Sequence, residues 1–249
     1  MKIRAALLLT FLALPLAPAA FATTSAQATF DEGNQLYEKG QFDDALQRYA
    51  SLASQGFGGV ALDYNLGNVH FRRGERGLAV LWYERALRLA PRDADIRFNL
   101  SLARSHIKSE GENFGERLLT FFSVNELAAA ATVSSFLFFG ALGLLALGKL
   151  RGDVLPTLSV TVTGLALVIS GAWTGAAVYL DRQPVAIVVS PPGEVRNGPG
   201  ADYAVGFTVP DGSKVVVLNR RPEWTQVGVP EQGLKGWMPS AELELVQPR

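Results

Sequence analysis

The stretch that decides the fold is "YNLGNVHFRRGERGLAVLWYERALRLAP", Tyr64 to Pro91, because the segment "FDEGNQLYEKGQFDDALQRYASL", which begins at Phe30, repeats its pattern. Five pairs of identical residues stand 34 residues apart: Gly33 and Gly67, Asn34 and Asn68, Gly40 and Gly74, Ala45 and Ala79, Tyr49 and Tyr83. A period of this length is typical of helical hairpins that stack to bury a shared core. We therefore predict an all-α repeat domain in the first half of the chain.

The second copy resembles the tetratricopeptide repeat. The matching residues are Leu66, Gly67, Gly74, Ala79, Tyr83, Ala86 and Pro91. The first copy departs from that pattern, with Glu32 in the place of the leucine and Phe57 in the place of the proline. A third helix, "ADIRFNLSLARSHI", restarts the pattern and stops, so we interpret it as a solvating cap. The predicted domain covers 28–110, with repeats at 28–59 and 60–93 and the capping helix at 94–108.

In such repeats the first helix of each hairpin lines a concave groove, and the resemblance assigns eight candidate peptide-binding residues to it. They are Phe30, Asn34, Tyr37, Glu38, Tyr64, Asn68, Phe71 and Arg72. The amides of Asn34 and Asn68 each offer a donor and an acceptor to the backbone of an extended peptide. Repeat one is acidic and repeat two is basic, which indicates either two solvated faces or a polarised groove that orients a partner. His70 faces the gap between the paired helices, and we interpret it as a structural residue.

The first residues have the features of a targeting segment. Lys2 and Arg4 precede the apolar run "AALLLTFLALPL", and "AFA" at 20–22 offers the small residues that signal peptidase prefers. We predict a signal peptide at 1–22 that is cleaved after Ala22, with Ala28 as the second choice of site. An uncleaved anchor is the other interpretation, and both interpretations predict that the residues that follow are exported.

Two uncharged apolar runs predict a membrane hairpin. The first is "LAAAATVSSFLFFGALGLLALG", 127–148, and the second lies within "VLPTLSVTVTGLALVISGAWTGAAVYL", 154–180. Roughly 20 helical residues cross the hydrocarbon core of a bilayer, and neither run shows the polar face of a soluble helix. We predict transmembrane helices at 127–148 and 155–180. Gly171 and Gly175 form a small-x-x-x-small pattern for helix packing, either between the two spans or with another membrane protein.

The turn between the runs indicates the orientation. Residues 149–153 include Lys149 and Arg151, and basic residues are enriched in short cytoplasmic loops. Together with the signal peptide, this predicts a cytoplasmic turn at 149–153 and two periplasmic domains on the bacterial inner membrane. Before the first run, "NFGERLLTFFSVNE" surrounds Glu116 and Arg117 with apolar residues, which predicts an interfacial amphipathic segment at 113–126.

After Arg182 the pattern changes to short valine-rich or alternating runs, which turns such as "PPG", "NGPG" and "PDG" interrupt. Such spacing is typical of a small all-β barrel. The stretches "EVRNGPG", "VPDGSKVVVL", "EWTQV" and "GWMPSAELELV" resemble the bacterial SH3-like domain, which predicts this fold for residues 183–249. We expect Trp237 in the core of this barrel. The candidate ligand face comprises Arg196, Tyr203 and Trp224, and the resemblance implies a peptide or a cell-wall fragment as the ligand.

The composition excludes several kinds of functional site. The chain has 249 residues, of which 23 are basic, 23 are acidic, two are histidines and none is cysteine. The absence of cysteine excludes disulfides and cysteine-ligated metals, and the balanced charge gives no basic excess for nucleic acid. The acids beside the spans, Glu126 and Asp153, have no base placed near them in the sequence, so a hydrolase is a weak alternative. We therefore expect no catalytic residues, no metal and no cofactor.

The order of the parts resembles the BatE-type proteins of the Bat (Bacteroides aerotolerance) operon family, most strongly in Tyr64–Pro91 and in "FFSVNEL", 121–127. The resemblance implies an inner-membrane scaffold that works with von Willebrand A-domain membrane proteins and is linked to aerotolerance or envelope stress. We expect a multidomain membrane protein, a non-enzymatic adaptor whose groove and SH3-like domain bind protein partners in the periplasm. The alternative is a cell-wall-anchoring module whose SH3-like domain binds peptidoglycan.

Overall fold

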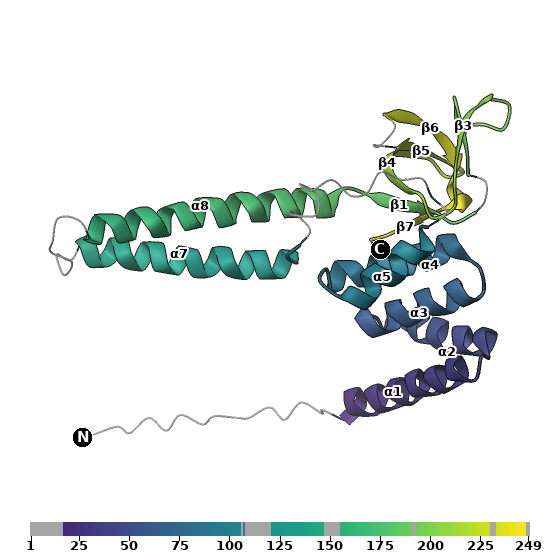
Figure 1. The fold of residues 1–249 in the computed structure, drawn as a ribbon, viewed down its shortest axis with the longest axis horizontal. Coiled ribbons are helices and arrows are strands. Elements are labelled where there is room, and N and C mark those ends of the chain that lie inside the picture. Colours follow the sequence, from purple (N-terminus) through teal and green to yellow (C-terminus); the bar gives the residue numbers. More distant parts are fainter. Residues whose placement is uncertain are drawn as a thin grey trace, which may run out of the picture. The chain divides into compact units, whose positions relative to one another are not determined.

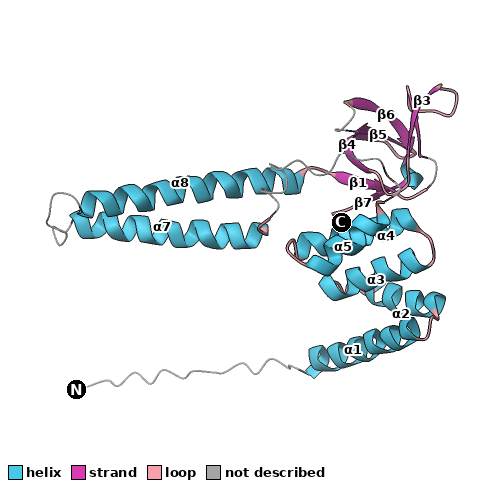
Figure 2. Ribbon diagram, viewed as in Figure 1, coloured by secondary structure: helices cyan, strands magenta, loops and turns pink. Residues whose placement is uncertain are grey.

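The computed structural model describes residues 17–105, 107, 121–146, 155–190, 193–229 and 233–247. The chain forms two compact units, Met1–Phe57 and Gly58–Arg249, whose elements are shown in Figure 1 and separated into helices and strands in Figure 2. Most of the predicted signal peptide, the predicted turn at 149–153 and residues 113–120 of the predicted interfacial segment lie outside the described residues. The first helix, α1 (Ala17–Glu38), includes both predicted cleavage positions, Ala22 and Ala28.

The first unit is a helical hairpin of α1 and α2 (Phe42–Ser54). Ala45, Tyr49 and Leu52 are buried at the i, i+4, i+7 spacing that puts apolar residues on one face of a helix. Gly33 permits the close approach of the two helices, because a Cβ there would stand 2.6 Å from Cε1 of Tyr49. Gly40 makes the turn with φ of 75°, a conformation that glycine adopts without steric cost.

The second unit begins with a hairpin of the same design, α3 (Val60–Arg72) and α4 (Arg76–Leu89). A Cβ at Gly67 would stand 2.5 Å from Cδ1 of Tyr83, and Gly74 makes the turn with φ of 79°. Residues that the 34-residue spacing pairs in the sequence therefore make the same contacts in the two hairpins.

His70 lies close to the turn of this second hairpin. It is buried, and its Nδ1 lies 2.6 Å from Oε2 of Glu75. Arg73 donates a hydrogen bond to Oε1 of the same carboxylate at 2.9 Å. The hydrogen bond from Arg73, with that from His70, holds the pKa of Glu75 below its ordinary value against the opposing effect of burial. His70 is thus a partnered residue within the fold.

α5 (Ala94–Ala103) follows the second hairpin and packs on α4. The carboxylate of Asp93 caps it by accepting hydrogen bonds from the backbone N–H groups two and three residues later. The residues buried on its inner face are Ile96, Leu100 and Ala103. The outer face departs from the predicted solvating cap, because Phe98 is 66 % exposed and Leu102 is 44 % exposed.

α7 (Val124–Ala146) and α8 (Leu155–Arg182) pack against each other along their length (Figure 1). Val124–Ala146 and Thr157–Arg182 are long and apolar enough to cross a membrane, by length and composition. The predicted spans, 127–148 and 155–180, cover nearly the same residues. Large apolar side chains are exposed on both helices, including Phe136, Leu137, Phe139, Leu165, Val168 and Ile169.

The closest glycine contact inside this helical pair is at Gly164. A Cβ there would lie 3.1 Å from Cε2 of Phe138. A Cβ at Gly171 or Gly175 would meet nothing within 4 Å in the part of the chain that the structure describes. Of the two alternatives for Gly171 and Gly175, the structure does not show packing of one described span on the other at these glycines, and docking to another membrane protein stays a prediction.

The C-terminal part forms one antiparallel sheet with the strand order β3-β2-β6-β5-β4-β1-β7. The strands are β1 (Val185–Val188), β2 (Gly193–Arg196), β3 (Val205–Val209), β4 (Lys214–Arg220), β5 (Trp224–Val229), β6 (Leu234–Pro239) and β7 (Leu243–Leu245). A single turn of 3-10 helix, Ser240–Glu242, precedes β7. The strands enclose a core of Ala186, Val188, Val195, Val209, Val215, Val227, Val229, Met238 and Leu243. Short antiparallel strands around one core agree with the predicted SH3-like barrel (Figure 2).

The barrel and the second hairpin share a second core. Ile187 of β1 and Val246 after β7 are buried in the same cluster as Val80 of α4. Gly77 of α4 touches the backbone of β1, since a Cβ there would stand 2.7 Å from the carbonyl oxygen of Val188. The sequence predicts a repeat domain and a barrel as separate modules, whereas the structure buries one against the other.

Candidate functional site

Three of the four groove candidates of the first hairpin contact its second helix. Oδ1 of Asn34 accepts a hydrogen bond from the hydroxyl of Tyr49 at 2.7 Å, and the Phe30 ring lies 5.7 Å from the Tyr49 ring, centroid to centroid. Tyr37 packs edge-on against the first residue of α2, with 5.4 Å between the ring centroids. Glu38, the last residue of α1, is exposed.

The second hairpin repeats this arrangement and extends it to α5. The hydroxyl of Tyr83 donates to Oδ1 of Asn68 at 2.7 Å, and the ring of Tyr83 lies 6.0 Å from that of Tyr64. Nδ2 of Asn99 in α5 donates to Oδ1 of Asn68 at 3.1 Å and to the hydroxyl of Tyr64 at 2.8 Å. The side-chain oxygen of Asn68 therefore accepts two hydrogen bonds from inside the protein.

The two remaining groove candidates, Phe71 and Arg72, end α3. Phe71 packs on the core that α4 shares with the barrel, and Arg72 is exposed. Our sequence reasoning missed the tyrosines that bond the asparagines, although in both repeats a tyrosine follows the asparagine by 15 residues. The oxygen acceptors that we expected to meet a peptide backbone are thus used within the hairpins.

On the barrel, Arg196 holds a loop together. Its Nη1 donates to the carbonyl oxygens of Ala201 and Tyr203 at 2.9 and 2.7 Å, and its Nη2 donates to Oε2 of Glu194 at 2.6 Å. Tyr203 is 51 % exposed, and its ring lies over Gly198, where a Cβ would stand 2.4 Å from it. The loop between β2 and β3 therefore keeps its tyrosine accessible, while the predicted ligand residue Arg196 serves the loop itself.

The two tryptophans of the barrel differ in exposure. Trp237 in β6 is buried, as we expected, and the guanidinium of Arg221 lies 4.8 Å from the centroid of its ring. Trp224 at the start of β5 is half-buried. The accessible aromatic surface of the predicted ligand face is thus supplied by Tyr203 and Trp224.

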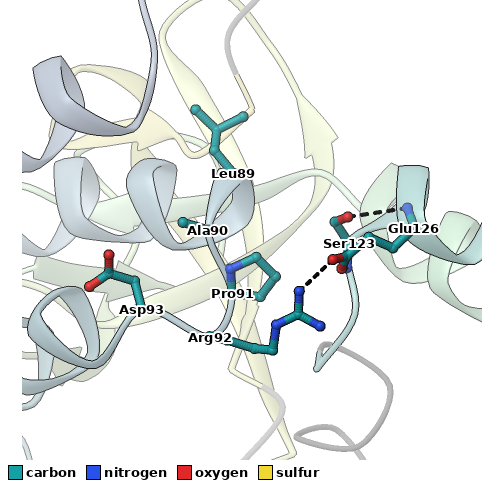
Figure 3. A pocket seen from close by; sticks show the side chains of 7 residues that line it. All are labelled: Leu89, Ala90, Pro91, Arg92, Asp93, Ser123 and Glu126. Carbon is teal, nitrogen blue, oxygen red and sulfur yellow. Dashed lines mark hydrogen bonds and ion pairs between the residues drawn. The ribbon is translucent and has the colours of Figure 1, made fainter.

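An open hollow of about 330 Å³ lies between the turn after α4 and the start of α7 (Figure 3). Its lining residues are Leu89, Ala90, Pro91, Arg92, Asp93, Ser123 and Glu126. Ser123 and Glu126 form a capping box at the start of α7: the backbone N–H of Ser123 donates to Oε2 of Glu126 at 3.0 Å, and the backbone N–H of Glu126 donates to Oγ of Ser123 at 3.3 Å. Arg92 forms an ion pair with Glu126.

The phenylalanines before this capping box support the same contact. The guanidinium of Arg92 lies 5.7 Å and 5.5 Å from the ring centroids of Phe121 and Phe122, distances at which a cation is attracted to the face of an aromatic ring. Phe122 in turn packs edge-on against Trp173 of α8, with 5.8 Å between the centroids. The stretch "FFSVNEL" therefore caps α7 and also holds the turn after α4.

A second clasp joins α4 to the end of α8. Arg88 forms an ion pair with Asp181 in the last turn of α8. Nε2 of Gln247, at the end of the barrel, donates to the carbonyl oxygens of Asp181 and Gln183 at 2.8 and 2.6 Å. The C-terminal end of α4 is thereby attached to the last turn of α8, and the turn after α4 is attached to the first turn of α7.

Charges are buried where α4 meets the barrel. Glu84 is 5 % exposed, with Arg104 at 2.7 Å and Lys214 of β4 at 3.8 Å. Burial alone would raise the pKa of Glu84, but the charges of Lys214 and Arg104 outweigh it and hold the pKa below its ordinary value. Nη2 of Arg85 donates to the carbonyl oxygen of Leu245 in β7 at 2.8 Å.

The carboxylate of Asp63 in α3 interacts electrostatically with Arg85, which lies at the same interface. Burial raises the pKa of Asp63 to about 6, while Arg85 opposes the rise. The ion pairs of Arg88, Arg92 and Glu84 each join one structural element to another, so these contacts form an attachment surface.

Comparison with known proteins identifies one part of the chain. A search of the curated proteins found no match. Residues 193–244, from β2 into β7, match the family model described as bacterial SH3 domain. The barrel that carries Tyr203 and Trp224 therefore contains a bacterial SH3 domain.

Proposed function

We propose that this chain is a non-enzymatic scaffold of the bacterial inner membrane. In this proposal α7 and α8 span the bilayer, and the predicted signal peptide and the basic turn at 149–153 place the hairpins and the barrel in the periplasm. The observation that carries the proposal is the attachment of α4 and the turn after it: α4 shares a buried core with the barrel and its Arg88 pairs with the end of α8, and Arg92 in the turn pairs with the start of α7. In this proposal these contacts hold the α3–α4 hairpin and the barrel at a constant height above the membrane.

The partners in this proposal are other membrane proteins. The resemblance to the Bat-type proteins favours those with von Willebrand A domains. Bacterial SH3 domains bind proteins or peptidoglycan, and the exposed ring of Tyr203 offers an amphipathic contact of the kind that is enriched at protein interfaces.

Photo-crosslinking in native membranes tests the scaffold. A photoreactive amino acid replaces Tyr203 in one variant and Leu218, which is 52 % exposed on β4, in the control variant. We expect Tyr203, and not Leu218, to crosslink to a membrane protein with a periplasmic domain, identified by mass spectrometry of the linked peptides. Equal labelling from both positions, or products with lipid alone, would contradict the proposal.

A reporter tests the topology. Alkaline phosphatase is active only after export, so we expect no activity from a fusion after Arg151 and full activity from a fusion after Gln247. Activity of the Arg151 fusion would overturn the orientation. The scaffold proposal would then have to place its soluble parts in the cytoplasm.

Binding of peptidoglycan is the second candidate function, and the family match at 193–244 is the observation that favours it. Pelleting of the full chain with purified peptidoglycan in detergent measures it. We expect a wall-binding protein to lose retention on Tyr203→Ala or Trp224→Ala and to keep it on Leu218→Ala. The full chain is needed because the barrel alone would expose Ile187 and Val246, which are buried in the core that it shares with α4.

A further inference from the structure

We infer that the outer face of α5, formed by Phe98 and Leu102, is the docking surface for an apolar-faced helix of a partner protein. This inference rests on the proposed scaffold function and names the class of partner. The two side chains are four residues apart and so lie on one side of the helix. They are 66 % and 44 % exposed, opposite the buried residues of α5.

The repeat shows what covers this face in a complete hairpin. Phe98 and Leu102 follow Tyr64 and Asn68 by 34 residues. In the second hairpin those two residues contact Tyr83 of the covering helix α4, through its ring and its hydroxyl respectively. The first hairpin makes the same contact between α1 and α2. Wherever the described chain completes a repeat, a second helix lies on this face.

α5 presents the same face without a second helix among the described residues. Its inner side continues the stack of the hairpins, since Asn99 bonds both Tyr64 and Asn68 of α3. Its outer side then continues an interface that the chain builds twice. The occupant that this interface accepts is an α-helix, not an extended peptide.

The residues on the face define the chemistry of that helix. Leu102 stands where Asn68 accepts a hydrogen bond from a tyrosine hydroxyl, and Ser101 stands where Gly67 makes room for the tyrosine ring. A tyrosine in the covering helix would therefore lose its hydrogen bond and meet the Cβ of Ser101. An aliphatic residue such as leucine avoids both costs. We expect the partner to present an amphipathic helix with an aliphatic stripe.

A peptide copied from α4 provides a defined probe. Two fluorescein-labelled peptides of residues 76–89 are compared, one with the native sequence and one with Tyr83→Leu, against the full chain in lipid nanodiscs. We expect the Tyr83→Leu peptide to bind at least tenfold more tightly than the native peptide in a fluorescence anisotropy titration. Binding of the native peptide with equal or higher affinity, or no binding of the Tyr83→Leu peptide, would overturn the inference.

Variants of the full chain locate the site. Phe98→Asp and Leu102→Asp should each weaken binding of the Tyr83→Leu peptide at least tenfold. Leu218→Asp, a matched change at a 52 % exposed leucine of the barrel, should leave the affinity unchanged. If Phe98→Asp and Leu102→Asp both bind like the parent chain, the peptide binds elsewhere and the inference fails.

A single fluorescent label shows what covers the face before the peptide is added. Because the chain contains no cysteine, Phe98→Cys accepts one bimane group. The inference is supported if the bimane first emits at the wavelength of a water-exposed label and its emission shifts to shorter wavelength when the peptide is added. Quenching by nitroxide lipid would assign the face to the bilayer, disulfide-linked dimers of the unlabelled variant would assign it to a second copy, and short-wavelength emission from a monomer without peptide would assign it to the chain itself. Each of these three results overturns the inference.

The two proposals fail separately. If the peptide binds at Phe98 but Tyr203 captures no membrane protein, the scaffold function fails and the helix-binding face stands. If Tyr203 captures a membrane protein but the peptide does not bind, the scaffold stands and the face of α5 has no role as a helix site.

Discussion

Two helical hairpins in this chain are alike inside and different outside. In both, a glycine of the first helix receives the tyrosine ring of the second, and the tyrosine hydroxyl bonds an asparagine. On the outer side of the second helix the likeness ends: Gly77 and Glu84 of α4 are buried, whereas their counterparts 34 residues earlier, Asp43 and Ala50 of α2, are exposed. The repeat therefore determines how a hairpin closes, and the residues outside the repeat pattern determine what the hairpin is attached to.

Glu84 gives the largest expected difference between the hairpins. Glu84→Ala leaves Arg104 and Lys214 without their shared partner at the interface with the barrel, and removal of one member of a buried ion pair costs about 3 kcal/mol or more. The counterpart change that adds a charge, Ala50→Glu, falls on an exposed position and should stay within about 0.5 kcal/mol. Chemical unfolding of the detergent-solubilised chain, followed by tryptophan fluorescence for the second unit and by hydrogen exchange for α2, measures both. Equal effects would refute the difference that we draw between the two outer faces.

Gly77 tests the contact between α4 and the backbone of β1. Gly77→Ala places a Cβ 2.7 Å from the carbonyl oxygen of Val188, and overpacking of this kind costs about 1–3 kcal/mol. Limited proteolysis should show β1 and the loop after it becoming accessible before α3 does. Alanine at the counterpart Asp43 removes an acid at an exposed position in the first turn of α2, a loss of less than about 1 kcal/mol. A stable Gly77→Ala variant with a protected β1 would show that the barrel can shift on α4 without cost.

The tyrosine hydroxyls test the hydrogen bond that the two hairpins have in common. Tyr49→Phe and Tyr83→Phe each remove the donor to an asparagine oxygen, and the loss of one such hydrogen bond costs about 1 kcal/mol. Because the tyrosine hydroxyl donates at 2.7 Å in both hairpins, we expect losses of protection of similar size in hydrogen exchange of α2 and α4. A loss in α2 with none in α4 would show that the hydrogen bond from Asn99 satisfies the oxygen of Asn68 without Tyr83.

The last comparison concerns the dependence of stability on pH, and it involves only the second hairpin. The folded state raises the pKa of Asp63 from 3.8 to about 6, so it binds the proton more tightly than the unfolded chain. Protonation of Asp63 therefore stabilises the fold, and stability should fall as the pH rises from about 4 to about 6. Glu84 has the opposite effect on stability. Its pKa is lowered in the folded state, so protonation of Glu84 destabilises the fold, and this loss appears only as the pH falls below the ordinary pKa of 4.5.

The variant Asp63→Asn isolates this effect. We expect it to be more stable than the parent chain at pH 7, and the difference between the two chains to vanish near pH 4. The counterpart of Asp63 in the first hairpin is Thr29, so hydrogen exchange of α1 should not respond to the substitution. A difference between the two chains that is constant from pH 4 to pH 7 would contradict the assignment to Asp63.

Much of the fold follows from local spacing. The 34-residue identities predict the two helical hairpins, the uncharged runs predict α7 and α8 within a few residues, and the valine-rich runs between turns predict the barrel. We did not predict the capping box of Ser123 and Glu126, although its two residues are only three positions apart. Nor did we predict Arg92 as the partner of Glu126, because 34 residues separate the two and the repeat pattern does not require an arginine there.

The sequence alone determined which segments form hairpins, apolar helices and a barrel, because periodic patterns and turn residues act within a few residues of one another. The tertiary structure decided that α4 shares a core with the barrel, that the asparagines of the groove bond tyrosines of their own hairpins, and that Arg196 holds a loop. It also decided that the outer face of α5 is apolar and exposed, in place of the predicted solvating cap. These outcomes depend on which surfaces meet across long stretches of chain, and the fit of a glycine against a distant carbonyl group leaves no period in the sequence.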